Sequence, residues 1–219
     1  NVRYNSLHNV DLSSDYFFTR KLTTKGNNNI EINDVLLGAS YERIDEKIFM
    51  EGRNVETKYT GIYFTKFNQK YDFIVNARHR GLDQGADVIV KGVLDDKSKV
   101  YFNGILKVDE KLKGINSFLG GHSLHLSSEC KSDSIPSLEI DSFDVKSGHA
   151  ASLTQMDEEK LFYMMSKGFS EEEAKKLMVR GFIEGALNRI SNEEFRKKVK
   201  FYMKEKGLEI IDLEFDYTV

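Results

Sequence analysis

His149 is the side chain with the clearest capacity for chemistry, and it lies in the segment KSGHAAS. A neutral imidazole is a good ligand for iron, and the small neighbours Gly148 and Ala150 leave room for a metal ion or a partner to approach. One imidazole alone cannot hold a metal ion firmly, so such a site would need further ligands. The alternative is a structural histidine that is hydrogen-bonded at the junction between two parts of the chain.

The other cysteine and histidine side chains are weak candidates for catalysis or metal binding. Cys130 is expected on an exposed turn, where only Lys131 would lower its thiol pKa, so we interpret it as incidental. His122 and His125 are three residues apart, which on a strand places them on opposite faces, so they are not expected to share a metal ion. His79 receives no role. No nucleophile elbow, phosphate-binding loop or zinc-binding cysteine pair occurs, and the sequence predicts no catalytic machinery.

Composition excludes several classes of protein. The 219 residues can form one domain with a smaller appendage, and 32 basic residues are scattered among 35 acidic ones. No basic stripe is present, so nucleic acid is not an expected partner. No apolar run is long enough to span a membrane, and the amino end lacks the apolar core of a signal peptide. With a single cysteine, which fits a reducing compartment, these features favour a cytoplasmic protein.

The elements that must position His149 are short strands. Between about residues 27 and 152 the chain alternates apolar and polar residues, and the expected strands are IEINDVLL, YTGIYFTKF, YDFIVNA, DVIVKGVL, KVYFNGIL, HSLHLSS and SLEIDSFDV. Two of them share one pattern, twelve residues apart, centred on Gly92 and Gly104. Such a repeat is typical of the stacked coils of a β-helix, although a sandwich or an open barrel would also give many short strands. Turns are expected at the clusters GNNN at 26–29 and LGG at 119–121.

After Gln155 the hydrophobic period changes from 2 to 3.6, which predicts helices. Asp157 is the expected N-cap of a first helix that ends at Gly168. The capping boxes Ser170 with Glu173 and Ser191 with Glu194 predict the start of a second and a third helix. The final segment, 208–219, alternates again and is expected to be a strand on an exposed sheet edge. We therefore divide the chain into a core at 1–155 and a helical domain with a terminal strand at 156–219.

Three sequence blocks carry a family resemblance: GVLDDKSKVYFNGILKV, PSLEIDSFDVKSGHAAS and DEEKLFYMMSKGFSEEEAKKLM. Over roughly residues 70–206 the chain resembles the SufB/SufD family, the paired scaffold proteins of the Suf iron–sulfur cluster assembly system. The resemblance implies a mainly β fold, with a right-handed parallel β-helix core followed by a small C-terminal α-helical domain.

The resemblance also bears on His149. SufD-like proteins have a segment similar to VKCSHGAT, in which His149 falls on the histidine and Ser147 replaces the cysteine. SufB-like proteins have a segment similar to EHEAT, whose glutamates are replaced here by Gly148 and Ala150. The chain is thus interpreted as a SufD-like member. His149 is its only expected metal ligand, so the isolated chain should hold no cofactor, and a transient iron–sulfur cluster would form only at a subunit interface.

Two protein partners are implied by the resemblance. The helical domain would dock a SufC-like ABC ATPase, and the β-helix would pair with a SufB-like or identical scaffold subunit in a hetero- or homodimer. Exposed methionine and aromatic side chains are common at adaptable interfaces. The residues expected to face the ATPase are Tyr163, Met164, Lys167, Gly168 and Phe169. The alternative for Met164 and Phe169 is that they pack the helices together.

The predicted function is a scaffold subunit without enzymatic activity. The competing hypothesis is a carbohydrate-active lyase or hydrolase, because some β-helix enzymes place acidic groups on an exposed parallel face. Asp87, Asp95 and Asp96 are the residues that such an enzyme would recruit. The cytoplasmic signature and the segment around His149 argue against this hypothesis.

Overall fold

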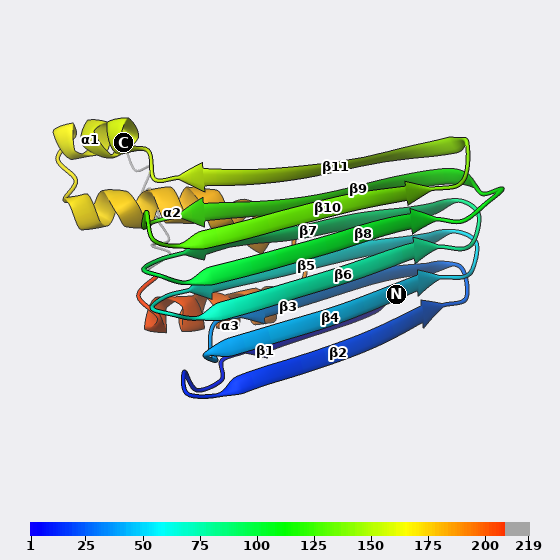
Figure 1. Cartoon of the computed structure of the whole chain (residues 1–219), viewed down its shortest axis with the longest axis horizontal. Helices are drawn as coiled ribbons and strands as arrows, with labels where there is room; N and C mark the ends of the chain where they lie inside the picture. The colour runs from blue at the N-terminus through cyan, green and yellow to red at the C-terminus, as the bar shows by residue number, and fades with distance from the viewer. Residues whose placement is uncertain (209–219) are drawn as a thin grey trace, which may run out of the picture.

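Successive strands alternate between two parallel sheets in the computed structural model, which describes residues 1–208 (Figure 1). Sheet A consists, in spatial order, of β1 (Val2–His8), β3 (Asn28–Leu36), β5 (Val55–Thr65), β7 (Gln84–Leu94), β9 (Lys113–His125) and β11 (Asp144–Gln155). Sheet B consists of β10 (Lys131–Ile140), β8 (Lys99–Val108), β6 (Lys70–His79), β4 (Tyr41–Met50) and β2 (Asp15–Thr24). The chain therefore winds as a parallel β-helix, which confirms the predicted fold class and rules out the sandwich and the barrel.

Inward-facing side chains of the two sheets form the core of the β-helix. Along β6 every second residue is buried, including Tyr71, Phe73 and Val75. The two glycines of the sequence repeat, Gly92 and Gly104, are inward positions of consecutive strands. A Cβ at Gly92 would lie 2.3 Å from Cδ2 of Tyr63, so the repeat reflects the close approach of neighbouring interior side chains.

Several corners of the β-helix have left-handed backbone angles. Asn27 and Asn54 have φ values of 47° and 57°, and the Asn54 side-chain amide donates to Asn27 Oδ1 over 3.1 Å. Asparagine tolerates this conformation better than most residues. The corner predicted at 26–29 is confirmed for Gly26 and Asn27, whereas Asn28 and Asn29 already belong to β3. The turn predicted at 119–121 is wrong, because these residues lie inside β9. Gly121 leaves room for the Phe102 ring, since a Cβ at this position would lie 2.5 Å from Cδ1 of Phe102.

Three strands were missed, and two predicted strands have the wrong bounds. The predicted strand HSLHLSS at 122–128 ends at His125, because residues 126–128 belong to the turn after β9. The strands β1, β2 and β4 were not predicted; in β4 the inward positions include Glu42 and Glu46, which break the apolar alternation. The predicted strand SLEIDSFDV at 137–145 spans the turn between β10 and β11, because its own alternation continues through the turn. His149 consequently lies in the middle of β11 rather than at the end of a strand.

Three helices follow the last strand: α1 (Glu158–Ser166), α2 (Glu171–Leu187) and α3 (Glu193–Glu205). Asp157 caps α1 by accepting from the Lys160 N–H over 3.0 Å, and Gly168, with φ 99°, follows its C-terminus. Ser170 and Glu173 form the predicted capping box of α2. The first two predicted helix starts are therefore confirmed.

The third helix starts differently from the prediction. Asn192 is the N-cap of α3 and accepts from the Phe195 N–H over 3.0 Å. The Ser191 N–H instead donates to Glu31 on sheet A over 2.8 Å. The capping box predicted from Ser191 and Glu194 is wrong, because the amide of Asn192 takes the capping position one residue later.

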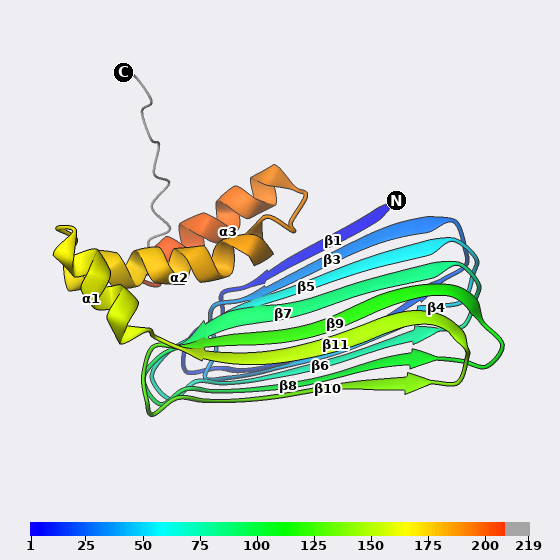
Figure 2. The same ribbon diagram turned by 90° about the horizontal axis from the view of Figure 1, so that it is seen from above.

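Helices α2 and α3 pack on the outer face of sheet A, whereas α1 lies beyond the end of the strands (Figure 2). One apolar cluster joins the two parts and includes Val35, Ile62, Phe64 and Val93 from the strands and Val179, Ile183, Val199 and Met203 from the helices. The division at 1–155 and 156–219 stays a prediction. The expected terminal strand lies outside the described residues except for Leu208. Within residues 1–208 no helix is long and apolar enough to cross a membrane.

Candidate functional site

The β-helix is open at the end formed by its last two strands. β10 and β11 are edge strands of their sheets, and most residues of β11 are exposed. Ile135 of β10 and Leu153 of β11 are 50% and 53% exposed. An edge strand presents one row of backbone N–H and C=O groups that can pair with another chain. This end therefore combines free backbone groups with apolar side chains.

His149 is exposed on this open end. It pairs in register with Leu119 of β9, whose side chain is buried in the core, so His149 stands on the inward face of the last strand. No hydrogen bond to its imidazole occurs among residues 1–208, unlike the structural histidine considered as an alternative. The ring is open to a ligand from outside, and its role as an iron ligand stays a prediction.

A buried polar network ends beside this histidine, and sequence reasoning assigned its members no role. Ser117 of β9 lies 2.6 Å from His79 Nε2, and His79 Nδ1 lies 3.1 Å from Gln84 Oε1. The Gln84 amide nitrogen donates to the backbone carbonyls of residues 50 and 52, which leaves Oε1 as the acceptor. Nδ1 of His79 must therefore carry the proton, and Ser117 donates to Nε2. Burial lowers the pKa of His79 to about 4, so the ring is neutral.

Ser147 of β11 continues this network toward the open end. It pairs in register with Ser117, and its hydroxyl is buried without a hydrogen-bond partner among the described residues. A buried hydroxyl without a partner costs free energy, which a group arriving at the open end would recover. Only the register of distant strands reveals this connection, because Ser147 and His79 are far apart in sequence.

Cys130 is buried, so the prediction of an exposed turn is wrong. Its side chain is only 5% exposed and belongs to the main core cluster. The thiol donates to the Ser127 carbonyl over 3.0 Å, and burial raises its pKa. The cause is its position just before β10, where the side chain points inward. A buried thiol with a raised pKa is less reactive, which agrees with the interpretation of this cysteine as incidental.

His122 and His125 bind different partners on different faces of β9. His122 Nδ1 lies 2.7 Å from Ser152 Oγ, and the buried His125 places Nε2 2.8 Å from Ser132 Oγ. Their predicted placement on opposite faces is confirmed. Within residues 1–208 no group of three or more His, Cys, Asp or Glu side chains is arranged to hold a metal ion.

Helix α1 has no buried residue. Of the residues expected to face a partner, Tyr163 and Phe169 are 62% and 42% exposed, and Lys167 and Gly168 are also exposed. The Lys167 ammonium lies 5.3 Å from the centroid of the Tyr163 ring. Met164 is half-buried.

Two further apolar side chains of α1 were not predicted. Phe162 and Met165 are 73% and 42% exposed. Together with Leu126, Met156 and Leu161 they line a groove of about 480 Å³ between α1 and the turn after β9. The helical spacing of Phe162 and Met165 indicates an apolar face of α1. The sequence does not show, however, that the turn after β9 lies next to that face.

The acidic residues of the competing enzyme hypothesis are not arranged for catalysis. Asp87 binds Arg189 over 2.7 Å near the start of β7, about 26 Å along the strand from Asp95. Asp95 and Asp96 lie in the turn after β7, where each accepts a backbone N–H over 2.9 Å. Two catalytic carboxyl groups of a glycosidase stand roughly 5–10 Å apart on either side of the sugar. These aspartates instead hold a turn and a helix connection.

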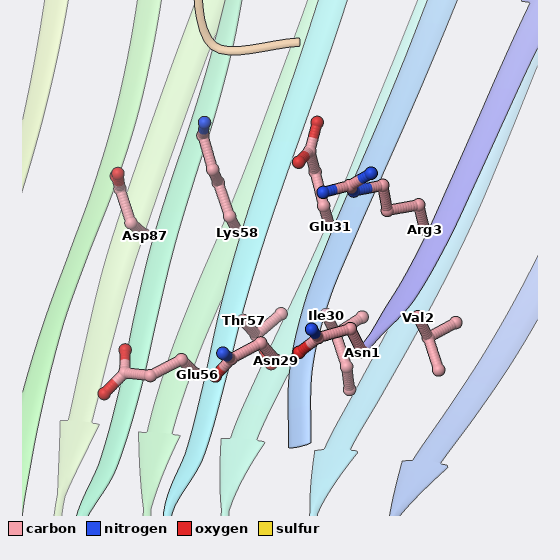
Figure 3. Close-up of a pocket in the computed structure, with 10 residues that line it drawn as sticks. All are labelled: Asn1, Val2, Arg3, Asn29, Ile30, Glu31, Glu56, Thr57, Lys58 and Asp87. Atoms are coloured by element: carbon pink, nitrogen blue, oxygen red, sulfur yellow. The ribbon is translucent and has the colours of Figure 1, made fainter. Parts of the chain in front are cut away.

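Charged side chains that line a pocket on the first coils connect the helices to sheet A. Figure 3 shows its charged side chains above the strands, among them Glu31, Glu56, Lys58 and Asp87, around a volume of about 400 Å³. Lys58 donates to the Arg189 carbonyl, and Glu31 and Asp87 bind the same α2–α3 connection. Burial raises the pKa of Glu56. We interpret this pocket as structural.

Comparison with known proteins gives a consistent match. The family model described as "SUF system FeS cluster assembly, SufBD core domain" matches residues 1–182. Proteins named iron–sulfur cluster assembly SufBD family protein, from Staphylococcus saprophyticus, Staphylococcus epidermidis and Staphylococcus aureus, are each 29% identical over 206 residues. The match covers 93% of this chain and 44% of each relative, so the chain spans less than half the length of these proteins.

Proposed function

The chain belongs to the SufB/SufD family of iron–sulfur cluster assembly proteins, and from this premise we propose that it is a scaffold subunit without enzymatic activity. In this proposal α1 docks an ABC-type ATPase, and the open end of the β-helix pairs with a second scaffold subunit. The iron–sulfur cluster is the cargo of the assembly. The carbohydrate-active enzyme is not favoured, because its candidate aspartates are engaged in structural contacts.

The observation that carries the proposal is the apolar surface of α1. A helix that buries no residue yet exposes several large apolar side chains gains little from the fold of its own chain. Such a surface is typical of a docking site, and aromatic and methionine side chains are enriched in interface cores. The exposed side chains are Phe162, Tyr163 and Met165 of α1, together with Phe169 just after the helix.

The free edges of β10 and β11 support the proposed pairing with a second scaffold subunit. Backbone groups of an edge strand can extend a sheet across a subunit boundary, and the apolar side chains at this end would be covered by the same contact. Either an identical chain or a SufB-like chain fits this description. Since His149 stands on the same end, a transient cluster there would be shared between the two subunits.

Substitution of Tyr163 by alanine tests the docking proposal. Large aromatic anchors contribute about 2 kcal/mol or more at interfaces, so Tyr163→Ala should weaken binding to the purified ATPase roughly thirtyfold in calorimetry. Phe201 of α3 is 59% exposed, which makes Phe201→Ala the matched control. An unchanged dissociation constant for Tyr163→Ala, or an equal loss for Phe201→Ala, would contradict the assignment. Co-purification of the chain with an ABC-type ATPase from the native host is the complementary test.

Cluster loading tests the role of His149. His149→Ala should leave folding and ATPase binding intact but lower cluster occupancy of the reconstituted two-scaffold complex, because one shared ligand is removed. Ser147→Cys should raise that occupancy by supplying a thiolate two residues away. Anaerobic reconstitution with iron counting measures both. A complex that is indifferent to His149→Ala, or a stoichiometric cluster on the isolated chain, would show that this end is not a shared site.

A further inference from the structure

Three lysines form a row across sheet B. Lys70, Lys99 and Lys131 are the first residues of β6, β8 and β10, and they are paired in register. All three are exposed. Neighbouring strands are about 4.8 Å apart, so this lysine ladder is about 10 Å long. Like charges directly opposite one another on a sheet are destabilising, so the row is an unfavourable feature of the isolated chain.

The chain does little to neutralise the lysine ladder. Within residues 1–208 none of the three ammonium groups forms an ion pair. The neighbouring Lys97 is paired with Glu129 over 3.5 Å, so this acid is already engaged. Asp133 lies two residues along β10 from the ladder and, in the described part of the chain, makes no ion pair with it. A net positive surface therefore remains at this corner of the sheet.

The ladder adjoins the surface that we assign to the ATPase. Together with Asn68, Lys97 and Glu129 it lines a depression of about 430 Å³. The turn between β9 and β10 separates this depression from the groove under α1, because residues of the turn line both hollows. Figure 2 shows that the strands of sheet B begin at the end of the β-helix beyond which α1 projects. One protein resting on this end could contact α1 and the ladder together.

We propose that the lysine ladder is a second contact for the same ATPase, and that it binds an acidic face of that protein. This inference rests on the proposed function. Apolar contacts with α1 would hold the complex together, while the ladder would attract and orient the partner as it approaches. Charges at the rim of an interface act mainly on the association rate, and their effect falls as salt screens them.

Charge reversal within the row tests the inference. With the purified ATPase, Lys99→Glu should lower the association rate constant about tenfold at 50 mM salt and leave the dissociation rate nearly unchanged. At 1 M salt, where the screening length is about 3 Å, the difference should vanish. Lys113 is an exposed lysine that begins β9 at the opposite end of the β-helix. Lys113→Glu is therefore the matched control and should bind like the unchanged chain.

The possible outcomes distinguish failure of the ladder contact from failure of the proposed function on which this inference rests. ATPase binding that is indifferent to Lys99→Glu, or equally sensitive to Lys113→Glu, would overturn the ladder contact and leave the docking of α1 intact. Absence of any ATPase binding by the unchanged chain would overturn both. The segment 209–219 contains four acidic and no basic residues. If replacing Asp212, Glu214 and Asp216 by the corresponding amides speeds association with the ATPase, the ladder binds this acidic segment of its own chain instead of the partner.

Discussion

The interior of the β-helix is charged in its first coils and neutral in its later ones. Between β1 and β5 the core contains Arg20, Asp34 and Glu46, and both carboxyl groups are fully buried. From β6 onward the described interior positions are apolar, or polar without charge as in the His79 network. Both interiors have the same backbone geometry. Parallel coils thus impose alternation of inward and outward residues but do not dictate what the inward residues are.

In the first coils one guanidinium lies beside two buried carboxyl groups. Arg20 lies 2.7 Å from Asp34 and 2.7 Å from Glu46, and its guanidinium carbon lies 4.1 Å from the centroid of the Tyr4 ring. Burial raises the pKa of Glu46 to about 8, although Arg20 acts in the opposite direction. Beside this group, His8 is bonded to Glu42, whose pKa burial also raises. Charges in this position are tolerated only as long as their partners are present.

Replacing Arg20 should cause the largest loss in the free energy of unfolding, because the charged interior depends on this side chain. Arg20→Met leaves the Asp34 carboxylate buried without its counter-charge, and breaking such a buried pair costs about 3–5 kcal/mol. Glu46, whose pKa is raised to about 8, is protonated at neutral pH and loses only a neighbouring donor. Urea unfolding followed by circular dichroism measures the loss. Arg53→Met is the matched control, because Arg53 is 68% exposed and binds Asp83 over 2.7 Å at the surface. This exposed pair should be worth about 1 kcal/mol or less, and a similar loss for both variants would erase the distinction.

The pH dependence of stability should follow from the same cluster. The unfolded chain releases the Glu46 proton near the ordinary glutamate pKa of 4.5, whereas the folded chain keeps it to about 8. The stabilising contribution of that proton is complete below pH 4.5 and is lost as the pH rises to about 8. Its slope is about 1.4 kcal/mol per pH unit within this window. Glu46→Gln should flatten the stability curve between about pH 5 and 8, and an unchanged slope in urea titrations would contradict this account.

The charged interior also explains why β4 was not predicted. Strands β7 and β8 were predicted because their inward positions are apolar, as in DVIVKGVL and KVYFNGIL. In YERIDEKIFM the inward positions Glu42 and Glu46 erase that alternation, so β4 resembles a solvated segment until its partners are known. The helix starts at Asp157 and Ser170 were predictable because capping is a local interaction. Asn192 shows the limit, since adjacent residues competed for one cap.

The candidate site was only partly predictable for a similar reason. His149 stood out through its neighbours and the family resemblance, and the exposed aromatic residues of α1 through helical spacing. The link from His79 through Ser117 toward Ser147 depends on the register of strands that are distant in sequence. The burial of Cys130 depends on how one turn directs its side chain. Neither long-range register nor a turn's orientation is encoded in local residue patterns.

The smallest effect concerns packing in the neutral coils. A methyl group at Gly92 would lie 2.3 Å from Cδ2 and 2.4 Å from the carbonyl oxygen of Tyr63, whose hydroxyl is held 2.7 Å from Ser123. Gly92→Ala should therefore cost about 1–3 kcal/mol in the free energy of unfolding. Gly181 in α2 has no heavy atom within 4 Å of the position of a Cβ, so Gly181→Ala should stabilise by about 0.5–1 kcal/mol through helix propensity. Urea titrations of both variants measure the change in the free energy of unfolding. A loss for Gly92→Ala and a gain for Gly181→Ala would show that tight packing at Gly92, and not a general effect of replacing glycine, causes the loss.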